Sequence, residues 1–169
     1  MSVLISNDGG IQVPIEADEI AQVIQAVLSA EAVERECSVS VSIVDEDEIQ
    51  SLNAMWRQID APTDVLSFEC DSPFGDEVPD GEVVELGDVI LCPAVIAAQA
   101  PDFNTTPADE FRLMLVHGML HLLGYDHIDS DDAARMEDRE LVILRGLAQV
   151  RGIDPQSIVI GPTTSHLDD

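Results

Sequence analysis

The sequence predicts one α+β domain, in which a small mixed β-sheet of about four strands packs against helices. The chain has 169 residues, the length of an ordinary single domain. Apolar residues make up 46% of it, and short alternating segments occur between longer segments with helical spacing. We expect the domain to span residues 1–151 and a flexible C-terminal tail to follow at residues 152–169.

The first half of the chain alternates between expected strands and helices. Residues 3–5 predict a first strand, and residues 17–32 predict a helix because apolar residues recur there every three or four positions. In residues 39–43, valine and isoleucine alternate with serine, which is typical of a half-buried strand. The acidic run 45–48 directly precedes a helical stretch at residues 49–56. We expect these acids to cap that helix rather than to bind a metal, since carboxylates accept hydrogen bonds from its free N–H groups.

The second half contains two further expected strands and two long helices. The strands lie at residues 64–69 and 86–91. Residues 71–85 between them contain prolines and glycines among acids, which predicts an exposed loop without chemistry. Apolar spacing predicts helices at residues 108–123 and 131–150.

The charge balance is strongly acidic. Thirty-four acidic residues oppose seven basic ones, all of them arginine, and the formal net charge is −27. Such a surface repels nucleic acid at long range, so a basic patch cannot be the basis of RNA binding here. A bound divalent metal together with a few arginines would create a local positive site within this acidic surface.

The chain is expected to be a soluble cytoplasmic protein with no membrane partner and no nucleotide cofactor. Its first residues include neither a basic region nor a long apolar segment of the kind that directs export. No run approaches the roughly 18 apolar residues that a membrane helix requires. Cys37, Cys70 and Cys92 are scattered singly, which fits a reducing compartment, and we expect each to serve as a small hydrophobic residue.

Three of the four histidines lie close together in the sequence. His117 and His121 are four residues apart, so on a helix they project from one face at the reach needed to share a zinc ion. Gly124 can take a positive φ and end the helix, which would turn His127 back toward the same metal. The fourth histidine, His166, falls in the expected tail and is excluded as a ligand.

These histidines predict a catalytic zinc site. The alternative is that they are ordinary core histidines, but the surrounding helix is apolar nearly all round, and a buried imidazole without a partner costs about 1–3 kcal/mol. Three neutral nitrogens favour Zn²⁺ over nickel or copper. Three protein ligands also leave a fourth position for water, which zinc makes acidic.

The spacing His-x-x-x-His-x-x-Gly-x-x-His also occurs in the metzincin proteases. Those enzymes carry a glutamate general base directly after the first histidine, where this chain has Gly118. A metalloprotease is therefore the less favoured enzyme.

The segment His-Gly-x-Leu-His-Leu-x-Gly-Tyr-Asp-His, from His117 to His127, resembles the hallmark of the YbeY family. The resemblance covers most of the chain between residues 39 and 147. It extends to two upstream blocks, of which one contains Leu52-Asn53, Arg57 and residues 63–68 and the other spans residues 86–90.

The resemblance implies an α+β metalloenzyme whose metal site lies in a cleft beside a small sheet and which cleaves single-stranded RNA internally. Such an endoribonuclease acts in ribosomal RNA processing, at the 3′ end of small-subunit (16S) RNA, and in ribosome quality control. Its expected partners are single-stranded ribosomal RNA and the small ribosomal subunit or its proteins. By resemblance, His117, His121 and His127 bind one Zn²⁺ and Arg57 is the catalytic arginine, whose planar guanidinium would grip a phosphate.

Three alternatives stay open at this point. Asp126, beside the third ligand, could equally cap a turn or orient a histidine, so the general base is not identified. Arg57 could instead make a surface ion pair with one of the many acids. The whole protein could be a non-catalytic, zinc-stabilised ribosome assembly factor, which the acidic surface favours, whereas an open metal position favours the enzyme.

Overall fold

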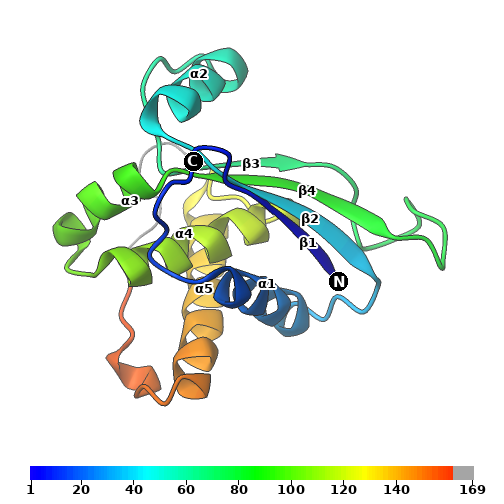
Figure 1. Cartoon of the computed structure of the whole chain (residues 1–169). Coiled ribbons are helices and arrows are strands. Elements are labelled where there is room, and N and C mark those ends of the chain that lie inside the picture. The colour runs from blue at the N-terminus through cyan, green and yellow to red at the C-terminus, as the bar shows by residue number, and fades with distance from the viewer. Residues whose placement is uncertain (162–169) are drawn as a thin grey trace.

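A four-stranded sheet forms the centre of the molecule. Its strands are β1 (Ser2–Ser6), β2 (Cys37–Ile43), β3 (Val65–Glu69) and β4 (Val84–Leu91), and their order in the sheet is β1-β2-β4-β3. The computed structural model describes residues 1–161. β1 and β4 each pair with β2 in parallel, whereas β3 pairs with β4 in the antiparallel direction. The expected mixed sheet in an α+β fold is therefore confirmed (Figure 1).

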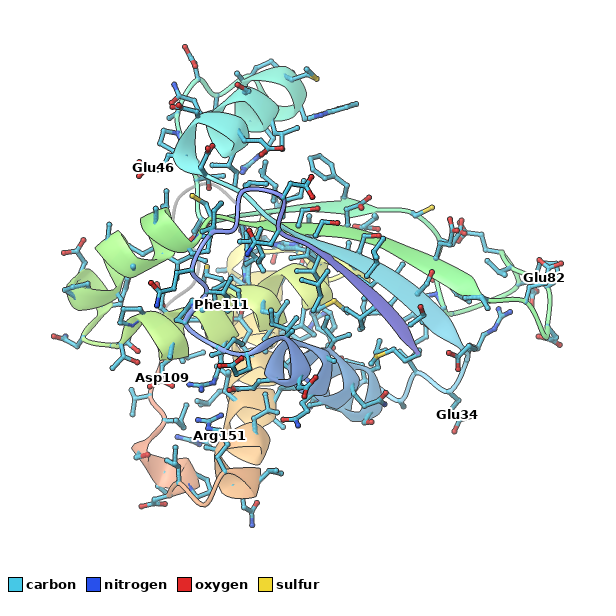
Figure 2. All side chains as sticks on the ribbon, viewed as in Figure 1. Glu34, Glu46, Glu82, Asp109, Phe111 and Arg151 are labelled. Atoms are coloured by element: carbon cyan, nitrogen blue, oxygen red, sulfur yellow. The ribbon has the colours of Figure 1, made fainter. Side chains whose placement is uncertain are left out.

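Three helices cover one face of this sheet: α1 (Ala17–Ala30), α4 (Pro107–Leu122) and α5 (Ser130–Val150) (Figure 1). α1 connects the parallel strands β1 and β2 and buries the apolar face expected from its spacing. α4 is buried nearly all round, because it contacts β3 and β4 of the sheet as well as the neighbouring helices α1 and α5. Its Phe111 is fully buried in this layer (Figure 2).

The opposite face of the sheet is more polar and only partly covered. Along β2, apolar residues are buried and the serines between them are half-buried, as the alternation predicts. α2 (Glu46–Arg57) packs over one end of this face, where Ile49 and Leu66 belong to a second, small apolar cluster. The Asp45 side chain accepts a hydrogen bond of 2.9 Å from the Glu48 N–H, which confirms the expected capping role.

A β-bulge interrupts the pairing of β2 with β4, and Gly87 lies at it. Gly87 has a φ of 130°, and a Cβ at this position would lie 2.0 Å from the carbonyl oxygen of Phe68. Any side chain here would therefore break the β3–β4 pairing. Arg35 holds the loop between β3 and β4, because its guanidinium donates to the carbonyl oxygens of Val78 and Pro79.

Two short helices after β4 were not expected from the sequence. α3 (Pro93–Gln99) has only 7 residues, and the 3-10 helix η1 (Ala100–Phe103) follows it directly. Together they form the connection to α4. Gln99 ties them to the core, because its Nε2 donates to Asp64 Oδ2 and to Glu110 Oε2, both at 2.9 Å.

The described residues include the first part of the expected C-terminal tail. Residues Pro155–Ser157 form the 3-10 helix η2, and Ile158 and Ile160 pack against the main core. His166 lies outside the described residues. Within residues 1–161, none of the helices combines the length and apolar character needed to cross a membrane.

Candidate metal centre

α4 places His117 and His121 on the same face, one turn apart. The Nε2 atoms of the two rings are 3.0 Å from each other. His127 reaches the same place from the turn after α4, and the three histidines can each offer a ring nitrogen within 4.8 Å of the others. Two nitrogens on a tetrahedral zinc are about 3.3 Å apart, since each Zn–N bond is about 2.0–2.1 Å long. The cluster is therefore compact enough to share one ion.

The turn that returns His127 depends on Gly124, as expected. Gly124 has a φ of 100°, a conformation that L side chains rarely adopt. Its N–H donates to the carbonyl oxygen of His121 at 3.0 Å, and the Tyr125 N–H donates to that of Leu120, also at 3.0 Å. This pair of bonds is a Schellman motif, which satisfies the last carbonyl groups of the helix while reversing the chain.

Hydrogen bonds to the Nδ1 atoms fix the tautomer and the orientation of two of the histidine rings. His121 Nδ1 lies 2.9 Å from the carbonyl oxygen of Tyr125, which can only accept, so Nδ1 carries the hydrogen. His117 Nδ1 lies 2.6 Å from Glu140 Oε2 and donates to this carboxylate. Both Nε2 atoms are then left with a lone pair, and two lone pairs 3.0 Å apart repel each other unless a cation lies between them.

His127 supplies an independent indication that the cluster is built for a ligand. Its Nε2 atom is buried, and it has no hydrogen-bond partner within residues 1–161. Burial also lowers the pKa of His121 to about 4, and the neighbouring His117 adds to this effect. The His121 imidazole is therefore neutral near pH 7, which is the form that binds metals. Three imidazole nitrogen donors fit zinc.

Glu140 was missed at the level of sequence. It lies 23 residues after His117 in the chain, on α5, and both side chains are fully buried. A carboxylate that orients a metal-binding histidine through its outer nitrogen is a common feature of zinc sites. The signal that could have found it is its place on the apolar face of α5, since Met136, Glu140, Ile143 and Leu144 are all buried.

A second carboxylate, that of Glu31 at the end of α1, connects the turn after α4 to α1. Tyr125 Oη donates to Glu31 Oε1 at 2.5 Å, and Arg139 Nε donates to Glu31 Oε2 at 2.8 Å. Asp126 Oδ1 accepts a hydrogen bond from the Ile128 N–H at 3.2 Å, so this side chain caps the turn. These contacts hold the segment that carries His127.

A groove beside the edge strand β3 connects the histidine cluster to Arg57. It has a volume of about 300 Å³ and is lined by Trp56, Arg57, His121 and the whole of β3. Arg57 is at the last turn of α2, and its buried Nη1 has no hydrogen-bond partner in the described chain. The structure thus brings all four sequence-predicted site residues to one region, with Arg57 and His121 on the same groove.

The cysteines lie apart from the histidine cluster. Cys37 and Cys92 are buried, as expected for small hydrophobic residues, and burial raises the pKa of both thiols. Cys70 is exposed, which differs from the expectation because it follows the last residue of β3 at the start of the loop. It lies near Asp71 and Glu85 on the surface.

Comparison with known proteins identifies the relatives of this chain. The family model described as Endoribonuclease YbeY matches residues 6–148, which include Arg57 and all three clustered histidines. The chain belongs to the YbeY family. This agrees with the resemblance seen in the histidine segment.

Curated members of the YbeY family are similar over most of this chain. An endoribonuclease YbeY from Halorhodospira halophila is 43% identical over 132 residues, covering 78% of this chain and 83% of that protein. One from Legionella pneumophila is 37% identical over 143 residues, covering 85% of this chain and 87% of that protein. A solution structure of a Thermotoga maritima protein is 25% identical with a TM-score of 0.57, and the match covers 89% of this chain and 91% of that one.

Proposed function

We propose that this protein is a zinc-dependent endoribonuclease that cleaves single-stranded RNA. The observation that carries the proposal is the shared groove, which is lined by Arg57 on one side and by His121 of the histidine cluster on the other. Family membership supports the activity, since the relatives are named endoribonucleases. A groove of this size lies at the small end of the range for ligand sites, about 300–1,000 Å³.

One group of residues would bind the metal, and a second group would orient the metal ligands. His117, His121 and His127 would hold the metal through their ring nitrogens, and Glu140 and the Tyr125 carbonyl would keep two of the rings oriented. When bound, zinc supplies Lewis acidity and makes water acidic, which is the chemistry that phosphodiester hydrolysis requires. Three protein ligands leave one coordination position of the zinc free for water.

Arg57 has the features of a phosphate-binding group. Its planar guanidinium can donate two hydrogen bonds to one phosphate and stabilise the charge that develops there. Although the chain has 34 acidic residues, the described residues give Arg57 no ion pair, and its Nη1 is buried and unpartnered. This favours a ligand-binding role over the surface ion pair considered above.

In the cell, we propose that the protein acts in the cytoplasm on ribosomal RNA. The proposed task is maturation of the 3′ end of small-subunit RNA together with ribosome quality control, in contact with the small ribosomal subunit or its proteins. The net charge of −27 supports an assisted reaction, because the free protein repels RNA at long range and a ribosomal partner would supply further contacts.

A protease is disfavoured by the packing of α4. Gly118 lies where this helix meets the sheet, and a Cβ there would lie 2.8 Å from Val89 Cγ1 and 3.1 Å from Ser67 Oγ. The glutamate general base of the metzincin proteases therefore has no room at this position. A zinc-stabilised assembly factor remains the second candidate, since the acidic surface suits protein contacts rather than RNA contacts.

The test is cleavage of a single-stranded RNA that spans a small-subunit 3′ end. Zinc-loaded wild-type protein is compared with Arg57→Ala, His121→Ala and the control Arg135→Ala, which removes an exposed arginine of α5 that does not line the groove. We expect cleavage by the wild type and the control only, with zinc lost from the His121 variant alone. Equal cleavage by all four proteins, or by none, would favour the assembly factor.

A further inference from the structure

We propose that Trp56 and Phe68 form a stacking subsite for an unpaired nucleobase, next to a phosphate site at Arg57. Both rings line the groove that also contains Arg57 and His121. Their centroids are 5.9 Å apart and their planes meet at 64°, an edge-to-face arrangement. The subsite rests on the proposed function, because it assigns to the same groove the part of the RNA that is not the reacting phosphate.

The exposure of Trp56 is the first argument for a ligand. Trp56 is 59% exposed, whereas Phe111, the aromatic residue of α4, is fully buried. Phe68 is half-buried and packs against the small apolar cluster beneath α2, which fixes its ring. An edge-to-face contact does not cover both faces of the indole, so a flat ligand can still stack on it.

The position of the pair beside Arg57 is the second argument. Trp56 and Arg57 are consecutive on a helix, so their side chains diverge by about 100° around its axis. Phe68 approaches the indole from β3, the edge strand that forms the other wall of the groove. A guanidinium and an aromatic face that diverge from neighbouring residues suit the phosphate and the base of one single-stranded segment.

The charge of the molecule is the third argument. With a net charge of −27 and no lysine, the protein cannot gain RNA affinity by neutralising many phosphates. Stacking on an aromatic ring does not require positive charge and tolerates any base. It is also available only to unpaired bases, because the faces of paired bases are covered within a duplex. The subsite would therefore contribute both affinity and selection of single strands.

Trp56 is the only tryptophan of the chain, so its fluorescence reports on the subsite directly. Zinc-loaded protein is mixed with a short single-stranded RNA, with the same sugar-phosphate chain lacking bases, and with a duplex. We expect the single strand alone to quench the fluorescence. In steady-state cleavage, Trp56→Ala should raise KM by about five-fold to more than a hundred-fold with little change in kcat, and Trp56→Phe should restore KM.

Met55→Ala is the matched control, since Met55 is 65% exposed on the same helix but does not line the groove, and its KM should equal that of the wild type. If the wild type cleaves RNA while Trp56→Ala keeps the wild-type KM, the subsite is overturned and the nuclease stands. If the wild type neither binds nor cleaves RNA, the proposed function fails and the subsite fails with it. Loss of binding to small ribosomal subunits by Trp56→Ala, with an unchanged KM for RNA, would make this a protein-docking surface and overturn the subsite.

Discussion

At the residue scale, the candidate metal centre depends on groups that never touch the metal. Glu140 is fully buried and accepts a hydrogen bond from His117 Nδ1 at 2.6 Å. This bond holds the ring in the tautomer that leaves Nε2 free, and it makes the imidazole a stronger donor. Without a carboxylate at this place, His117 would lose both its orientation and part of its basicity.

Replacing Glu140 by glutamine should therefore weaken metal binding by about 10- to 100-fold, since the amide keeps the shape but not the charge of the carboxylate. Competition with a chromophoric zinc chelator measures the affinity. Asp138→Asn, an exposed charge on the same helix, is the control and should bind zinc as the wild type does. Equal affinities for all three proteins would contradict the role of Glu140.

The pKa of His121 gives the metal-free protein a defined pH dependence. Burial lowers this pKa to about 4 from 6.5, so the unfolded chain binds a proton more readily than the folded one. Stability is then complete above pH 6.5 and is lost as the pH falls toward 4, by at most about 3 kcal/mol. Urea unfolding of metal-free wild type and His121→Gln at several pH values measures this. Parallel curves for the two proteins would show that His121 contributes nothing.

The histidines could be predicted from sequence because helical spacing and one glycine were enough to bring them together. His117 and His121 needed only the period of the helix, and His127 needed only the turn at Gly124. Glu140 could not be found in this way. Its place on the apolar face of α5 indicates burial but names no partner, and its contact with His117 exists only because α5 packs on α4.

At the element scale, the position of the site depends on the close approach of α4 to the sheet. Gly118 allows this approach, and the Ser67 hydroxyl donates to its carbonyl oxygen at 3.1 Å. A Cβ at Gly118 would meet Val89, Ser67 and Val65 within 3.3 Å. A side chain there would push the helix away from β3, and with it His121, which lines the groove.

Gly118→Ala should therefore destabilise the protein by about 1–3 kcal/mol, although alanine is the better helix former. Gly146→Ala is the matched control. It lies in the interior of α5, where an added Cβ would meet no atom beyond its own helix within 4 Å, so it should stabilise the protein by about 0.5–1 kcal/mol. Urea unfolding of the two variants measures the free energies. A stabilised Gly118→Ala would contradict the tight packing of α4.

The helices and strands could be predicted from the sequence where the apolar periodicity extends over many residues. The expected helix at residues 131–150 differs from α5 by one residue at its start. The 7 residues of α3 were too few to show a period, and alanine, valine and isoleucine in that segment fit several structures. The position of β4 between β2 and β3 could not be predicted from the sequence either, because strand order depends on which faces pack together rather than on any one segment.

At the scale of the whole molecule, the acidic surface separates this protein from nucleic-acid-binding proteins with basic grooves. Carboxylates occur at both ends of the sheet, with Glu34 and Glu82 near one end and Glu46 at the start of α2 near the other (Figure 2). Several of the seven arginines are engaged within the protein: Arg35 and Arg145 donate to carbonyl oxygens, and Arg112 and Arg139 pair with glutamates. Arg57 is thus a rare cation that is available to RNA.

This distribution predicts an unusually shallow salt dependence of RNA binding. One phosphate contact on a single strand gives a slope of about −0.7 in a plot of log affinity against log salt concentration. Screening of the repulsion between the acidic surface and RNA acts in the opposite direction. We therefore expect a slope no steeper than about −1 for the wild type, measured by fluorescence titration at several salt concentrations. Arg57→Ala should flatten the slope by about 0.7. Trp56→Ala should lower the affinity but leave the slope unchanged, because stacking releases no counterions. A steep slope in the wild type would mean that several cations bind phosphates, and the acidic surface would then not set the mode of binding.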